Sequence, residues 1–128
     1  MSYGFSKTVS LSYESTIEKA TEELKKEGFG VLTSIDIKET LKKKLDVDFN
    51  KYIILGACNP QFAYQALQAE EQVGLLLPCN VIIYEKDGKT VLAAFDPMSM
   101  AKVMDNEAME PIADQVRAKL LRALNAVE

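Results

Sequence analysis

Residues 81–95 read VIIYEKDGKTVLAAF, two apolar segments on either side of an Asp-Gly pair. Such a pair is the strongest short signal of a β-hairpin, because the central residues of the tight turn need positive φ. We therefore expect strands over 81–85 and 90–95, joined at Asp87-Gly88. A two-residue turn leaves no room for a crossover helix, so at least part of the sheet must be antiparallel.

The first segment of the chain has the pattern of a half-buried strand. Between residues 3 and 11, apolar side chains alternate with glycine and small polar ones, and Lys7 is the one exception on the apolar side. Alternation with a period of two is typical of a strand that has one face against the core.

Helix signals follow this strand and the next two. Residues 15–18 (STIE) and 36–39 (DIKE) spell capping boxes, and Asn59-Pro60 combines a preferred N-cap with a preferred first helical residue. Gly28 supplies a stop. We expect helices over 14–27, from 36 through 45 and from 59 through 67, with strands at 30–35 and 51–58.

The remaining elements are a buried strand and a long final helix. The continuous apolar character of 51–58 predicts a strand buried on both faces. Asp96-Pro97 predicts a short helical turn, and the apolar positions between Met109 and Val127 fall on one face of a helix.

The expected order is β-α-β-α-β-α-β-β-α, over a single domain that spans residues 1–128. We assign the class α+β, with a mainly antiparallel sheet and its helices packed on one face. The other face needs a cover, and a second copy of the chain is the simplest one. A homodimer is therefore expected.

Composition limits the partners and the location. The net charge of −4 gives no electrostatic footprint for nucleic acid, and the apolar runs are too short to span a bilayer. Residues 1–5 lack the features of a signal peptide. Two cysteines fit a reducing compartment, so a cytoplasmic location is expected.

The chain contains no histidine. This excludes the histidine-dependent catalytic triads and the zinc sites that use imidazole. Two cysteines cannot make a four-cysteine zinc site within one chain. We expect no cofactor, no metal and no enzymatic activity.

The residues that could carry out chemistry lie in two similar tripeptides, Cys58-Asn59-Pro60 and Cys79-Asn80-Val81. Antiparallel pairing of their strands would bring the two thiols close together, and a helix N-terminus can lower a thiol pKa. The competing interpretation is that both cysteines are small buried hydrophobic residues, which is common for free cysteine.

Four polar residues are further candidates for a site. Asn59, Asp36 and Asp96 each have a local explanation as helix caps. Asn80 has no such explanation and is assigned equally to a turn or to a pocket wall.

Four ordered blocks carry a family resemblance: GFGVLT at 28–33 with IDIK at 35–38, LGACNP at 55–60, GLLLPCNV at 74–81, and Asp96-Pro97. Together they resemble the domain-of-unknown-function 302 family from about residue 5 to the end. The resemblance implies a TATA-binding-protein-like fold, a dimer, and no established reaction. It also implies that the family's hallmark residues line one pocket, and these are Cys58, Asn59, Pro60, Pro78, Cys79, Asn80, Asp36 and Asp96.

Three functions remain open at this point. The first is a dimeric, non-catalytic module that binds a small apolar or amphipathic molecule, with residues 75–77 (LLL) as an apolar wall. The second is a thiol-dependent role in redox chemistry, sulfur relay or soft-metal binding at Cys58 and Cys79. The third is a purely structural subunit.

Overall fold

The computed structural model describes residues 3–128, so Met1 and Ser2 of the amino-terminal stretch lie outside the described residues. Its elements are β1 Gly4–Val9, α1 Tyr13–Lys26, β2 Gly30–Asp36, α2 Ile37–Leu45, β3 Tyr52–Cys58, α3 Pro60–Ala69, the 3-10 helix η1 Glu71–Leu76, β4 Cys79–Lys86, β5 Lys89–Phe95, α4 Pro97–Met104 and α5 Met109–Asn125. The predicted order of strands and helices is confirmed. The structure adds η1 and extends the expected turn after Asp96 into α4.

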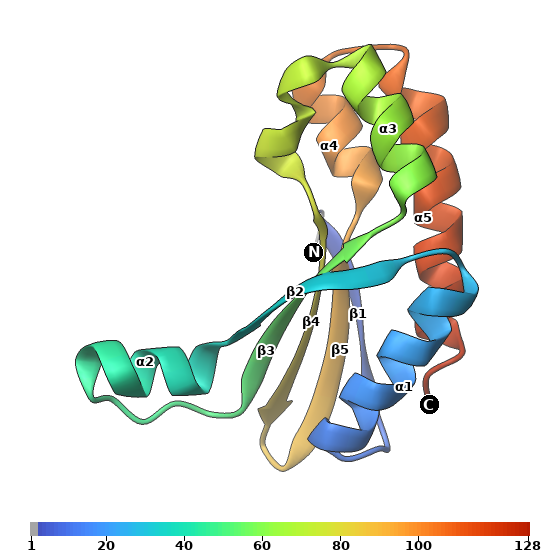
Figure 1. Cartoon of the computed structure of the whole chain (residues 1–128). Coiled ribbons are helices and arrows are strands. Elements are labelled where there is room, and N and C mark those ends of the chain that lie inside the picture. Colours follow the sequence, from blue (N-terminus) through green and yellow to red (C-terminus); the bar gives the residue numbers. More distant parts are fainter. Residues whose placement is uncertain (1–2) are drawn as a thin grey trace.

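The strands form one five-stranded sheet in the order β1-β5-β4-β3-β2. Every neighbouring pair is antiparallel, including the predicted hairpin of β4 and β5. Helices α1 and α5 pack on one face, while α3 and α4 gather at one end of the strands beside α5 (Figure 1). The α+β class with helices on one face is therefore confirmed.

The main core lies between the sheet and the α1–α5 pair. Its largest fully buried side chains include Leu24, Phe29, Ile83, Leu92 and Leu120. Burial of such side chains contributes about 1.5–3 kcal/mol each relative to exposure. A second cluster, which includes Ala66, Val73, Met100 and Met109, fills the space between α3, η1, α4 and the start of α5.

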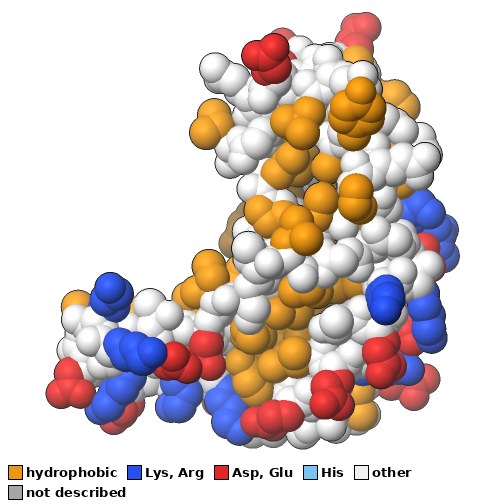
Figure 2. Space-filling view, in the orientation of Figure 1, with side chains coloured by type: hydrophobic (Ala, Val, Ile, Leu, Met, Phe, Trp, Pro, Cys, Tyr) orange, Lys and Arg blue, Asp and Glu red, His pale blue; other side chains and the backbone are white. Residues whose placement is uncertain are grey.

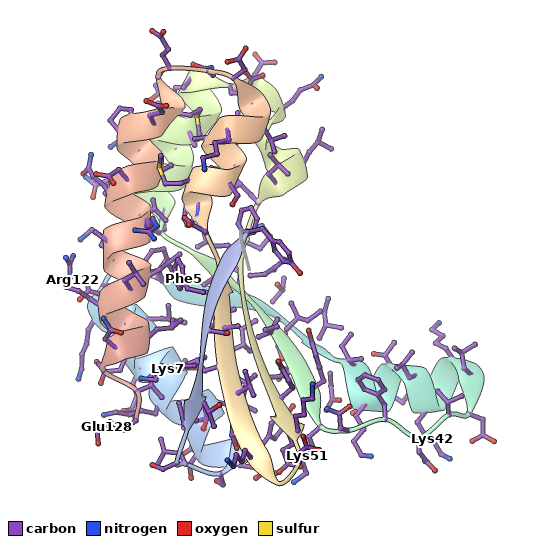
Figure 3. All side chains as sticks on the ribbon, turned by 180° about the vertical axis from the view of Figure 1, so that it is seen from behind. Phe5, Lys7, Lys42, Lys51, Arg122 and Glu128 are labelled. Carbon is purple, nitrogen blue, oxygen red and sulfur yellow. The ribbon has the colours of Figure 1, made fainter. Side chains whose placement is uncertain are left out.

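Lys7, the exception in the alternating pattern of β1, also points toward the helices. Its ammonium donates a hydrogen bond to the Leu124 carbonyl oxygen at 3.0 Å, and a second one to that of Val127. These carbonyls belong to the C-terminal end of α5 and the residues that follow it, where the helix dipole favours a cation. Figure 3 shows Lys7 beside that end of the helix.

The prediction that the third strand is buried on both faces is wrong. Leu55 pairs with Val81 and faces the helices, and both are buried. Ile54 pairs with Ile35 on one side and Ile82 on the other, on the face opposite α1 and α5. Tyr52 and Tyr84 stack on that same face, with ring centroids 5.2 Å apart. We call this apolar surface, formed by Ile35, Tyr52, Ile54, Ile82 and Tyr84, the open face.

Helix α2 extends away from the rest of the molecule (Figure 1). None of its residues is buried. It begins at the predicted cap, because the Asp36 carboxylate accepts a hydrogen bond from the Glu39 amide at 2.9 Å. The Asp36 side chain therefore serves as the N-cap of α2.

Candidate functional site

A cavity of about 350 Å³ lies at the end of the sheet where the helices gather. The sheet contributes residues from β2, β3 and the start of β4, and the helices contribute residues from α3, α4 and α5. The size is at the lower end of the range of small-molecule sites, roughly 300–1,000 Å³.

Pairing between β3 and β4 explains why the cavity lies there. Ala57 pairs with Cys79, so the end of β3 and the beginning of β4 lie side by side. The chain leaves β3 into α3 through Cys58 and Asn59, and it enters β4 through Leu77 and Pro78. All of these residues line the cavity.

Small side chains leave the space open. Ala57, Ala63, Ala66 and Ala113 come from three different elements and all line the cavity. Alanine contributes a wall with little volume, so close backbone packing still leaves a hollow. Larger apolar residues such as Phe62 and Val116 then give that hollow its hydrophobic surface.

The lining contains no charged side chain. Its polar members are Thr33, Asn59 and the two cysteines. Such a surface favours apolar molecules, because a charge placed there would lose its water without gaining a partner.

Asn59 is held by a contact that its position in the sequence does not predict. It occupies the N-cap position of α3, but its side chain makes no capping hydrogen bond, so the prediction of a side-chain cap is wrong. Its amide nitrogen instead donates to the Glu27 carbonyl oxygen at 3.3 Å. A Cβ atom on Gly28, whose φ is +88°, would lie 2.9 Å from that nitrogen. The end of α1 therefore positions Asn59.

The two cysteines line the same cavity and form no disulfide. Burial, which is the main cause, and the neighbouring Cys58, which is the second, together raise the pKa of the Cys79 thiol to about 11. Cys79 is therefore protonated near neutral pH. This is the opposite of the direction that a reactive thiolate needs.

Of the other predicted site residues, Pro78 also lines this cavity, and Pro60, Asp96, Asn80 and Asp36 lie elsewhere. Pro60 is exposed in the first turn of α3. Asp96 caps α4 by accepting from the Met98 amide at 3.0 Å, and it pairs with Arg117 at 3.1 Å. Asn80 lies in a second groove, of about 420 Å³, between η1 and the open face. Pro78 lines both the cavity and this second groove, whereas Asp36 lines neither and caps the start of α2.

Several lining residues were not among those singled out from the sequence. Phe29, Met100, Ala113 and Val116 line the cavity without any polar signal. The periodicity of α5 indicated that Val116 lies on its apolar face. It did not indicate that this part of the face borders a hollow, because that depends on how α3 and α4 pack against α5.

Residues 3–128 contain no group of three or more histidine, cysteine, aspartate or glutamate side chains that could hold a metal ion. Among the helices of the same residues, none is long and apolar enough to cross a membrane.

Comparison with known proteins identifies a family. The sequence model of the domain of unknown function DUF302 matches residues 5–127. The crystal structure of an uncharacterized conserved DUF302 protein from Bacillus stearothermophilus has a TM-score of 0.94 and 32% sequence identity, and covers 100% of both chains. No curated protein matches the chain.

The contact between Gly28 and Asn59 predicts an unequal effect of two alanine substitutions. Gly28→Ala and Gly88→Ala both place alanine at positive φ, which costs about 1–2 kcal/mol. Only Gly28→Ala also presses a methyl group against Asn59, since a Cβ on Gly88 would meet nothing within 4 Å. Urea denaturation should therefore show a larger loss of unfolding free energy for Gly28→Ala.

The excess loss should disappear when both glycine variants are compared in an Asn59→Ala background. Equal losses for the two variants in the wild-type background would show that Asn59 moves aside freely.

The raised pKa of Cys79 predicts slow alkylation. In a Cys58→Ser variant, iodoacetamide should modify native Cys79 with a pH midpoint well above the ordinary thiol value, because burial is the main cause of the raised pKa and remains in the variant. The unfolded variant in urea should titrate near the ordinary value of about 8.5. A raised pKa reduces the thiolate fraction below the midpoint, so the native rate at neutral pH should be at least tenfold below the unfolded rate. Similar native and unfolded midpoints would contradict this assignment.

Proposed function

The chain belongs to the DUF302 family of domains of unknown function, and from its cavity we propose that it is a non-catalytic module that binds a small apolar molecule. The observation that carries this proposal is the uncharged, largely apolar lining of the cavity. Each 100 Å² of apolar ligand surface removed from water contributes about 2.5 kcal/mol before the costs of association.

The way in which the lining is built supports this function. Helices and strands supply most of the wall, so little of it has to become ordered when a ligand enters. Leu32 and Leu67 line the cavity while remaining 68% and 43% exposed. Leu32 lies on β2 and Leu67 on α3, so they border the opening of the cavity between these two elements. Figure 2 shows hydrophobic side chains gathered over the helical end of the side of the molecule that it presents.

The thiol-dependent alternative receives less support. The shared cavity brings Cys58 and Cys79 into one place, as that hypothesis requires. The raised pKa of Cys79 opposes it, because nucleophilic attack and soft-metal binding both need the thiolate. The same burial suits an apolar cavity wall.

We also propose that two copies associate through the open face. The row Ile35, Ile54 and Ile82 crosses three neighbouring strands on this face, and Ile35 is 47% exposed. Exposed apolar surface of this kind is typical of an interaction site. A two-fold axis would place the same row against its copy, which is the usual geometry of a homodimer.

Charge and cysteine content support the rest of the proposal. A net charge of −4 disfavours nucleic acid as a partner. Two free cysteines fit the reducing cytoplasm. The family match over residues 5–127 supports a single domain that occupies the whole chain.

Ligand binding can be tested by filling the cavity. Ala63 lines it, so Ala63→Phe should place a ring in the hollow and weaken binding of butylbenzene by at least tenfold in isothermal titration calorimetry. Ala118→Phe makes the same change at an exposed position of α5 and should leave binding unchanged. Failure of the wild-type protein to bind butylbenzene, together with no ligand in native mass spectrometry of freshly purified protein, would contradict the proposal.

Dimerisation can be tested at the edge of the open face. Ile35→Glu should convert a dimer into a monomer in sedimentation velocity, because a two-fold interface would bury both new carboxylates without a compensating charge. Val103→Glu, at a position on α4 that is 76% exposed, is the matched control and should remain dimeric. A wild-type protein that stays monomeric at high concentration would refute the dimer.

A further inference from the structure

We propose that the cavity selects an uncharged ligand that carries a hydrogen-bond donor such as a hydroxyl group, and that the Asn59 side-chain oxygen accepts that hydrogen bond. This inference rests on the proposed binding function and narrows its ligand class. It follows from the orientation of one amide and from the charges around the cavity.

The orientation of the Asn59 amide is determined by its partner. A backbone carbonyl can only accept, so the atom that faces the Glu27 oxygen at 3.3 Å must be the nitrogen, Nδ2. The other amide atom, Oδ1, is therefore an acceptor. Among residues 3–128, no donor is hydrogen-bonded to it. Asn59 lines the cavity, and its Oδ1 is the acceptor that we assign to a bound molecule.

Thr33, the other uncharged polar group of the lining apart from the thiols, is less available. A Cβ atom on Gly56 would lie 2.1 Å from the Thr33 hydroxyl oxygen, so this oxygen packs against the glycine backbone of β3. The missing side chain at Gly56 thus accommodates the hydroxyl. Asn59 differs from Thr33 because a hydrogen bond to Glu27, outside the lining, fixes the position of its side chain.

Two ion pairs lie on or next to the elements that line the cavity. Arg117 holds Asp96 at 3.1 Å, and Arg122 holds Glu27 at 3.0 Å. Neither pair belongs to the lining, which has no cation to compensate a carboxylate or phosphate. An anionic ligand would lose its hydration there without a partner, and its acceptor oxygens would face an amide oxygen that can only accept.

Three probes of matched shape separate these contributions: para-butylphenol, butylbenzene and para-butylbenzoate. The phenol supplies a donor, the hydrocarbon supplies none, and the benzoate is an anionic acceptor. Titration of the wild-type protein should give the tightest binding for the phenol, binding several-fold weaker for butylbenzene, and no measurable binding for the benzoate.

Asn59→Ala should remove the preference for the phenol over butylbenzene. Butylbenzene serves as the internal control for folding, since that variant should still bind it within a few-fold of the wild-type affinity. If Asn59→Ala is too unstable to measure, Asn59→Ser supplies a shorter side chain at the same N-cap position and should reduce the same preference.

The possible results test separately the selection for uncharged ligands, the role of Asn59 and the binding function itself. Benzoate binding as tightly as the phenol would overturn the selection for uncharged ligands, and equal binding of phenol and butylbenzene would overturn the role of Asn59. In both cases the binding function itself would stand. If none of the three probes binds the wild-type protein, the proposed function and this inference fail together.

Discussion

Pairing of Ala57 with Cys79 is the constraint on which the arrangement of the cavity depends. It places the exit of β3 beside the entrance of β4 and thereby directs α3 and η1 to the same end of the sheet. The remaining wall comes from α4 and α5, which follow β5. A shift of this register by one residue would turn Cys79 and every other side chain of β4 to the opposite face.

The same antiparallel register separates two apolar surfaces. In β3 and β4, successive side chains point to opposite faces of the sheet. Those that do not lie on the open face, such as Leu55 and Ile83, are buried under α1 and α5. Their neighbours Ile54 and Ile82 lie on the side that these helices leave uncovered. Continuous apolar sequence in β3 thus has two different causes: one face builds the core, and the other forms the open face that we propose for association. Both surfaces are apolar, and they lie on opposite faces of the same two strands.

Local features of the sequence were sufficient for much of the fold. The Asp87-Gly88 turn, the caps at Asp36 and Asp96, and the stop at Gly28 each depend on a few adjacent residues, and the structure contains all of them. The hydrogen bond of Asn59 could not be predicted in this way, because Glu27 lies 32 residues earlier in the chain. The local cap motif indicated the backbone position of Asn59 correctly but not the direction of its side chain.

The candidate site was predictable only where it contains unusual residues. Cys58, Asn59, Pro78 and Cys79 attracted attention, and all four line the cavity. The alanines that create the hollow carried no signal, since alanine in a helix is ordinary and becomes informative only when opposing elements also present small side chains.

Burial links these observations. The apolar wall that makes the cavity suitable for an uncharged molecule also removes water from Cys79 and raises its pKa. A reactive thiolate would need compensating charge in the lining, and the lining has none. The two candidate functions therefore place opposite demands on the same surface. The lining suits the apolar binding that we propose, and Cys79 contributes to it as a protonated, weakly polar part of the wall.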